Sequence, residues 1–342
     1  MRGTTVLAAA IFLVAAPLGA QEYVWNDDRP DGVAPVGIAN DRTLPAGTIE
    51  LGYRFGHVDA RGLRFGEVQV EETDVLDLGF TFVPLSRTVN AHMVTAGLGI
   101  TDAFTVTGTA GFVTKTRETA NADLFFVNES SGIADIEVDA LYELYRQGPY
   151  RGHVQMGVLI PLGATDAEGD FGPDAGVLLP YDMQIGTGSW ALMPGVTGQV
   201  MNEFGSVGGQ LRGVFSLMDN DRGYRPGTRV EGRLWMAYRF NDFVSLSAGV
   251  RGVTADPIQG FDADLETLRD PGDLALGFGT QRVDLPLGVN LRLPAGPLAG
   301  QRISAEAVWT VHEQTDGPQL GGNWGLVLGW QGAFDFSTIW PL

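Results

Sequence analysis

The feature that most constrains this chain is a repeated alternation of apolar and polar residues along extended segments. In residues 323–336 one face is apolar and ends in aromatic residues on both sides; it comprises Trp324, Leu326, Leu328, Trp330, Phe334 and Phe336. A period of two places successive side chains on opposite faces of a β-strand. Because aromatic rings favour the two membrane interfaces and aliphatic side chains the hydrocarbon between them, this pattern predicts a strand with one face toward lipid.

The same alternation recurs in residues 228–240, 280–293 and 302–312. In 280–293, for example, Leu285 and Leu287 alternate with Asp284. A soluble β-sandwich also alternates, but its strands are rarely so long and its core face seldom ends in aromatic residues. The sequence therefore predicts an all-β protein, a transmembrane antiparallel up-and-down β-barrel.

The first twenty residues are typical of a secretory signal peptide. Arg2 provides a positive start, Val6 to Ala16 are apolar, and Ala20 is a small residue at the expected cleavage site. The apolar run is shorter than the roughly 18 residues that a membrane-spanning helix needs. We therefore expect residues 1–20 to be removed and the mature chain to reach the bacterial cell outer membrane.

Charge and cysteine content exclude several classes of function. The formal net charge is −19 and Lys115 is the only lysine, which argues against a nucleic-acid partner because phosphate backbones repel an acidic surface. The chain has no cysteine, which excludes disulfides, thiolate–zinc sites, iron–sulfur clusters and a cysteine nucleophile. No cofactor or metal site is predicted.

Short turns and long loops alternate along the chain, as they do in outer-membrane barrels. We expect twelve strands, at residues 47–58, 89–100, 104–116, 132–146, 152–162, 188–202, 207–218, 228–240, 243–252, 280–293, 302–312 and 323–336. Two further strand-like segments, 73–83 and 176–186, give an alternative of fourteen. We prefer twelve, with these two segments as extracellular hairpins or as pieces folded into the lumen. Residues 47–342 then form the barrel, and the proline-rich residues 21–46 form a periplasmic leader or a plug.

Short motifs in a fixed order resemble a family of bacterial outer-membrane proteins. They are Gly99-Ile100-Thr101-Asp102-Ala103-Phe104, Gly132-Ile133-Ala134-Asp135-Ile136, Ile160-Pro161-Leu162-Gly163, Gly186-Thr187-Gly188 and Asp316-Gly317-Pro318-Gln319-Leu320. The chain is similar in these runs to the transporter-like family named for the meta-pathway of phenol degradation. Ala134 and Leu162 depart from the usual residues of that family, and Ser337 to Leu342 extend past the last aromatic strand. The resemblance implies passage of small molecules, including aromatic or hydrophobic compounds.

Charged residues on the inward phase of the predicted strands are the candidate site. One set is acidic and lies on a single strand: Asp135, Glu137, Asp139 and Glu143. The other set is mainly basic: Arg212, Arg229, Arg233, Arg239, Arg251, Arg282, Arg292 and Arg302, with Glu231, Asp284 and Glu306. Charges inside a barrel need water or partners. Two interpretations stay open: an acidic and a basic wall around a wet pore, or ion pairs that close a narrow barrel.

The predicted function is a passive channel for small molecules, with outer-membrane lipid and lipopolysaccharide, the barrel-assembly machinery and a small-molecule permeant as partners. The alternative is a structural or adhesive barrel without a through-path. An outer-membrane hydrolase ranks third, because none of His57, His92, His153 and His312 lies in a serine-hydrolase motif. The acid-rich residues 253–279 are interpreted as a solvated surface loop rather than a calcium site.

Overall fold

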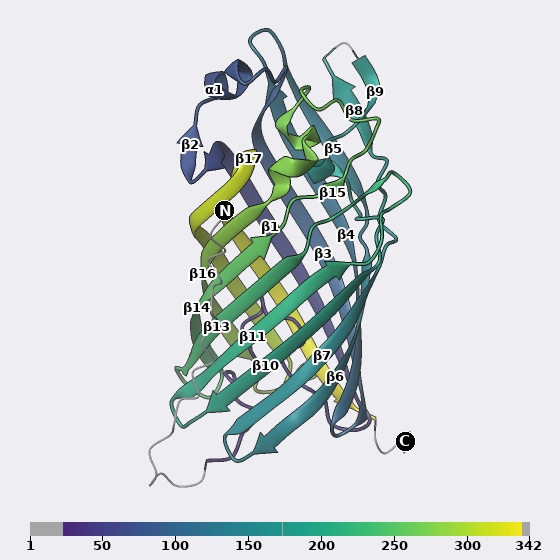
Figure 1. Cartoon of the computed structure of the whole chain (residues 1–342). Coiled ribbons are helices and arrows are strands. Elements are labelled where there is room, and N and C mark those ends of the chain that lie inside the picture. The colour runs from purple at the N-terminus through teal and green to yellow at the C-terminus, as the bar shows by residue number, and fades with distance from the viewer. Residues whose placement is uncertain (1–22, 173, 337–342) are drawn as a thin grey trace, which may run out of the picture.

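Consecutive antiparallel strands close into a barrel in the computed structural model, which describes residues 23–172 and 174–336 (Figure 1). The ring consists of β1 (Thr48–Gly66), β3 (Val83–Thr101), β4 (Phe104–Ala120), β6 (Ile136–Gln147), β7 (Tyr150–Ile160), β10 (Ala191–Met201), β11 (Gly205–Ser216), β13 (Arg229–Arg239), β14 (Val244–Ala255), β16 (Thr280–Arg292) and β17 (Arg302–Asp335). Pairing of β1 with β17, from Thr48 opposite Asp335 to Gly66 opposite Thr315, closes the ring. The expected signal peptide and the Ser337–Leu342 extension lie outside the described residues.

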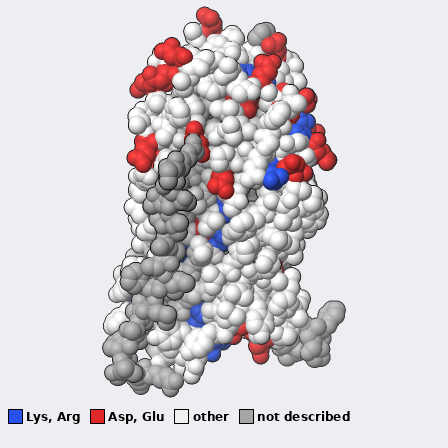
Figure 2. Space-filling view, viewed as in Figure 1, with Lys and Arg blue, Asp and Glu red and all other residues white. Residues whose placement is uncertain are grey.

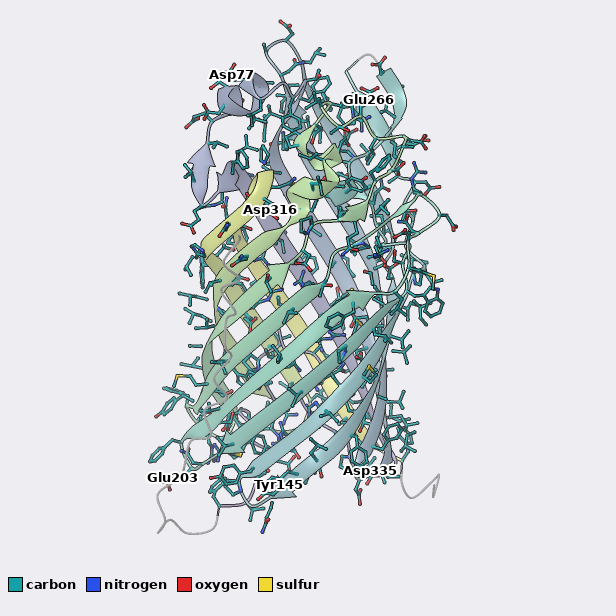
Figure 3. The ribbon with its side chains drawn as sticks, viewed as in Figure 1. Asp77, Tyr145, Glu203, Glu266, Asp316 and Asp335 are labelled. Carbon is teal, nitrogen blue, oxygen red and sulfur yellow. The ribbon has the colours of Figure 1, made fainter. Side chains whose placement is uncertain are left out.

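The last strand element, β17, crosses the wall twice. Its first part pairs with β16 and its second part with β1, both antiparallel. Because β1 and β16 themselves run in opposite directions, the two parts of β17 also do. Trp330 Nε1 donates to Gln301 Oε1 at 2.8 Å, so the two ends of β17 lie side by side. Figure 3 shows Asp316 in the upper part of the barrel and Asp335 at the bottom. The eleven strand elements therefore make twelve crossings, in agreement with the preferred prediction, and most of the predicted loop 313–322 belongs to the strands.

Short turns lie at one end of the barrel and long loops at the other. The short-turn end has the turns after β3, β6, β10, β13 and β16, and both described chain ends lie there (Figure 1). The loop end carries β2 (Val68–Val70), α1 (Glu72–Asp77), β5 (Phe125–Ile133), β8 (Glu168–Phe171), β9 (Asp174–Leu178), β12 (Tyr224–Arg225), β15 (Gln259–Gly260) and the 3₁₀ turns η1 (Tyr181–Met183), η2 (Pro271–Asp273) and η3 (Ala275–Phe278). In outer-membrane barrels the short turns face the periplasm.

The two strand-like segments predicted in the loops, 73–83 and 176–186, differ in structure. Residues 73–83 are not a strand: they contain most of the helix α1 and lead into β3. The Asp74 carboxylate accepts a hydrogen bond from the Glu71 backbone N–H at 2.9 Å, a helix-start contact that the alternation of apolar residues does not reveal. Residues 176–186 contribute β9, which pairs with β8 in a small hairpin at the loop end, and then η1.

The outward face of the strands is apolar over the middle of the barrel. On β16, Leu285, Leu287 and Leu291 are 39%, 52% and 39% exposed, whereas Asp284 and Asn290 are 1% and 2% exposed. Figure 2 shows a mainly white middle zone, with most of the charged residues of that view gathered at the loop end. The period-two phase assigned from the sequence therefore holds on β16. No helix in the described residues is long and apolar enough to cross a membrane.

A cation on the outward face tests this phase. We expect Leu287→Arg to lower the free energy of unfolding in lipid by about 2–4 kcal/mol if residue 287 lies near the midplane, because the guanidinium enters hydrocarbon. Gln331→Arg is the control, since residue 331 borders a cavity inside the barrel. Urea unfolding in lipid vesicles measures both variants. A larger loss for Gln331→Arg would show that the two faces are exchanged.

Candidate functional site

Residues 23–46, here called the lumen segment, run inside the barrel near the short-turn end (Figure 1). Ala34 and Ile38 pack against the inward-facing Trp235 of β13, and all three side chains are buried. The segment has no regular helix or strand, so its backbone needs partners from the wall. Gln210 of β11 donates to the Ala39 carbonyl at 2.9 Å, and wall residues of other strands make similar contacts.

Arg151 of β7 is the main anchor of the lumen segment. Its guanidinium donates to the Asp27 carboxylate at 2.7 Å and to the Gly32 carbonyl at 3.0 Å, and it lies 3.6 Å from the Asp41 carboxylate. The same guanidinium stacks on the ring of Trp25, 3.8 Å from the ring centroid. Arg151 is only 5% exposed, so these contacts replace the water that its charge would otherwise require.

Gly37 lets the lumen segment approach the opposite wall. A Cβ atom at this position would collide with the carboxylate of Glu306 on β17 and would lie 2.8 Å from Nη1 of Arg233 on β13. Arg233 also donates to the Gly37 carbonyl at 2.5 Å. The absence of a side chain at residue 37 is therefore required for this seating.

The predicted charged residues in the middle of the barrel form ion pairs. Arg212 of β11 reaches Glu137 of β6 at 2.8 Å and Asp139 at 3.6 Å, although β7 and β10 separate these strands in the sheet. A second group surrounds two carboxylates. Glu231 binds Arg229, Arg233 and Arg251, and Asp284 binds Arg251 and Arg282.

The remaining predicted residues lie elsewhere. Asp135 accepts hydrogen bonds from the backbone N–H groups of Gly163 and Thr187, both at 2.9 Å, and so ties a loop to the barrel mouth. Glu143 is at the short-turn end, where Thr43 and Arg146 donate to it. Arg239 pairs with Asp242 in a short turn, Arg292 pairs with Asp28, and Arg302 donates to the carbonyls of Asp27 and Arg29.

A second buried charge cluster joins the wall to the turns η1 and η2 at the loop end. Arg117 of β4 binds Asp182 of η1 and Asp270 at the start of η2, and Lys115 donates to the Asp182 carbonyl at 3.0 Å. Burial raises the pKa of Asp270. For Asp182, burial acts in the same direction, but Arg117, Arg87 and Lys115 outweigh it and lower the pKa. Asp182 therefore stays ionised among these cations.

The prediction of a solvated acidic loop at residues 253–279 is wrong for three of its carboxylates. Asp262, Asp270 and Asp273 are at most 5% exposed and bind Arg222, Arg117 and Arg269, respectively. Arg222 and Arg117 are distant in the chain, so the loop sequence does not reveal them, whereas Arg269 lies in the same loop, four residues before Asp273. Within residues 23–172 and 174–336, no three histidine or carboxylate side chains converge as metal ligands.

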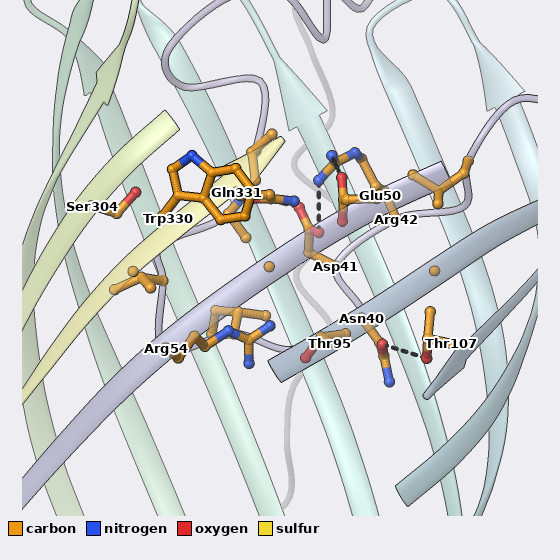
Figure 4. Close-up of a pocket in the computed structure, with 18 residues that line it drawn as sticks. Asn40, Asp41, Arg42, Glu50, Arg54, Thr95, Thr107, Ser304, Trp330 and Gln331 are labelled. Carbon is orange, nitrogen blue, oxygen red and sulfur yellow. Dashed lines mark hydrogen bonds and ion pairs between the residues drawn. The ribbon is translucent and has the colours of Figure 1, made fainter. Parts of the chain in front are cut away.

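Between the lumen segment and the wall lies a cavity of about 50 Å³ (Figure 4). Arg54 of β1, Ser304 and Gln331 of β17, and Thr95 of β3 line its wall side. The lumen segment contributes aliphatic side chains and the group Asn40, Asp41 and Arg42. Arg42 binds the carboxylates of both Asp41 and Glu50.

Sequence reasoning missed Arg54, Arg151 and the Asp41–Arg42 pair. The alternation could have found Arg54, because it lies two positions beyond Gly52 and four beyond Glu50 on the face that borders the cavity. Arg151 is the second residue of β7, just before the predicted strand start at 152. Asp41 and Arg42 lie in a segment without periodicity, where no local signal indicates which way a side chain points.

No family model and no curated protein matches this chain. Among solved structures, the chain is similar to the COG4313 outer membrane channel from Pseudomonas putida F1, with 14% identity, a TM-score of 0.61, and coverage of 88% of this chain and 100% of that chain. The KdgM porin gives 8% identity and a TM-score of 0.40 over 83% of this chain and 99% of that chain. The translocator domain of the autotransporter NalP from Neisseria meningitidis gives 12% identity and a TM-score of 0.44 over 85% of this chain and 90% of that chain.

The first likeness establishes a shared barrel fold, and the other two scores are too low to carry an argument. This chain is a bacterial outer-membrane β-barrel. Its closed ring and apolar outward face match that environment. A barrel fold hosts different functions, so the role of the interior has to be argued from its own residues.

Seating of the lumen segment can be tested at Gly37. We expect Gly37→Leu to displace the segment, because the new side chain collides with Glu306. The chain lacks cysteine, so a single Ala34→Cys reporter, at a site that is 5% exposed, measures the displacement by its rate of maleimide labelling. Labelling should accelerate by about tenfold or more, the equivalent of roughly 1.4 kcal/mol.

Gly56→Leu is the matched control, since no atom lies within 4 Å of a Cβ atom built at residue 56. It should leave the labelling rate of Ala34→Cys unchanged. Equal rates in all three backgrounds would contradict the role assigned to Gly37.

Proposed function

We propose that this protein is a passive outer-membrane channel for small molecules, and that the structure describes its closed state. The observation that carries the proposal is that irregular backbone, rather than wall side chains, occupies the barrel interior near the short-turn end. A twelve-crossing barrel is intermediate between filled barrels of about 8 strands and open porins of about 16–18. Displacing the lumen segment therefore leaves a passage lined by polar groups.

The contacts of the lumen segment support reversible closure. Many of them are hydrogen bonds and ion pairs, such as Asp27 with Arg151 and Asp28 with Arg292, which water can replace. The apolar contact of Ala34 and Ile38 with Trp235 is small. In this proposal residues 21–46 are a plug rather than a periplasmic leader.

The charged rows act as the selectivity element of the open channel. Glu137 and Asp139 lie on β6, whereas Arg229, Arg233 and Arg251 lie on β13 and β14 across the sheet order. In the closed state these rows are held by the pairs around Arg212 and Glu231. Once water enters, opposed acidic and basic walls orient polar permeants, as charged rings do in pores.

The family resemblance extends the proposal to the permeant. The motifs around Thr101, Asp135 and Asp316 are similar to the phenol meta-pathway family, which supports small aromatic or hydrophobic compounds as substrates. Residues 1–20 serve as the signal peptide. The barrel itself has the barrel-assembly machinery and lipopolysaccharide as its partners in the membrane. We propose no enzymatic role.

A structural barrel without a through-path is the second candidate. The cluster of Arg117, Asp182 and Asp270 favours it, because these buried ion pairs hold loops over the barrel mouth. Breaking such a pair typically costs about 3–5 kcal/mol, so the mouth opens less easily than the short-turn end.

Planar-bilayer conductance decides between these candidates. We expect a variant lacking residues 27–45 to conduct ions, because the plug is removed. Gly37→Leu should conduct more than the wild type, because the plug is displaced. Folding is checked by the heat-dependent gel shift of a barrel. A folded variant without the plug and without conductance would leave only the structural barrel.

Ion selectivity tests the charged rows. In the variant without residues 27–45, Glu137→Gln together with Asp139→Asn should shift selectivity toward anions, because one sign of fixed charge is removed. The control is Glu203→Gln in an exposed turn at the bottom of the barrel in Figure 3, which should have little effect. Unchanged selectivity in the double variant would refute an acidic wall.

A further inference from the structure

Arg54 stands apart from the other cations of the molecule. Every other arginine in residues 23–172 and 174–336, and Lys115, has a hydrogen bond or ion pair to the protein, whereas Arg54 has neither. It is partly buried and lines the cavity beside the lumen segment, and in Figure 4 no dashed line reaches it. A guanidinium without a protein partner inside a barrel requires water or an anion.

The nearest carboxylates of the cavity are already engaged. Asp41 and Glu50 both bind Arg42, and Arg151 lies 3.6 Å from Asp41. Arg54 is therefore left with its fork of N–H donors facing the cavity. Such a fork matches the two oxygens of a carboxylate.

Two neighbouring wall residues provide further unused polar groups. Ser304 is in the first part of β17 and Gln331 in the second, and both line the same cavity. Their side chains make no hydrogen bond to the described residues. Gly329 is the residue opposite Arg54 in the pairing of β1 with β17. A side chain at residue 329 would collide with Val36, so glycine keeps this part of the cavity open.

The other side of the cavity is aliphatic. Val33, Val36 and Ile38 of the lumen segment line it. The cavity volume of about 50 Å³ is several times the roughly 10–15 Å³ that one water molecule requires. One face thus provides a cation with hydroxyl and amide groups, and the other provides hydrocarbon.

We infer that this cavity is a binding site for small monocarboxylates, with the carboxylate on Arg54, Ser304 and Gln331 and the hydrocarbon part against Val36 and Ile38. The inference rests on the proposed channel function and assigns it a substrate class. A bound acid contacts wall and lumen segment together, so its arrival and departure are linked to seating of the plug.

Equilibrium dialysis of the detergent-purified full mature chain with radiolabelled propionate tests the site. Propionamide is the neutral probe of equal heavy-atom count. We expect propionate to bind at least tenfold more tightly than propionamide. Arg54→Gln should lower propionate affinity at least tenfold and abolish the discrimination, whereas Arg54→Lys should retain part of it. Arg61→Gln, which alters an exposed arginine on the same strand that pairs with Asp59, should behave as the wild type.

Equal binding of the two probes by the wild type, or unchanged propionate binding in Arg54→Gln, would overturn the inference. So would displacement of propionate by an equal concentration of chloride, which would indicate a general anion site. If Arg54→Gln fails to fold, Ser304→Ala provides the second variant. It should weaken the binding of propionate and leave the binding of propionamide unchanged.

The binding assay requires no permeation. Tighter binding of propionate than of propionamide without conductance would support the site and refute the channel. Conductance with equal binding of the two probes would support the channel and refute the site.

Discussion

The pairing of β1 with β17 is the constraint on which the rest of the structure depends. Hydrocarbon offers no hydrogen bonds to backbone N–H and C=O groups, so a sheet that spans it has to close without a free edge. Residues 48–66 and 315–335 provide that closure. Because β17 crosses twice, the chain both begins and ends its barrel at the short-turn end. The lumen segment therefore enters the interior from that end.

Irregular backbone inside a barrel creates its own demand for partners. The carbonyl groups of the lumen segment lie away from the sheet, and several of them accept hydrogen bonds from inward-facing side chains. Arg151 donates to the Gly32 carbonyl, Arg233 to the Gly37 carbonyl, and Arg302 to the Asp27 carbonyl. Much of the basic character of the interior thus stabilises the lumen segment in the closed state, and only part of it is paired with carboxylates of the wall.

Alternation in the sequence was enough to predict most of the barrel. Strand phase on β16 was readable because Leu287 and Asp284 must lie on opposite faces once the residues are extended. The helix α1 was missed, since it is short and depends on contacts such as the Asp74–Glu71 hydrogen bond rather than on periodicity. The loop sequence predicts a solvated Asp270, and the structure buries it, because its partner Arg117 is 153 residues away in the chain.

The sequence by itself determined the fold class, the faces of the strands and the inward position of most charges, because the period of two is a local property of extended backbone. Only the tertiary structure decided which charges meet. Ring closure and the path of the lumen segment decide that Arg212 binds Glu137. They also decide that Arg54 lines the cavity without a hydrogen bond or ion pair to the described residues. Those are long-range outcomes, and no spacing between neighbouring residues encodes them.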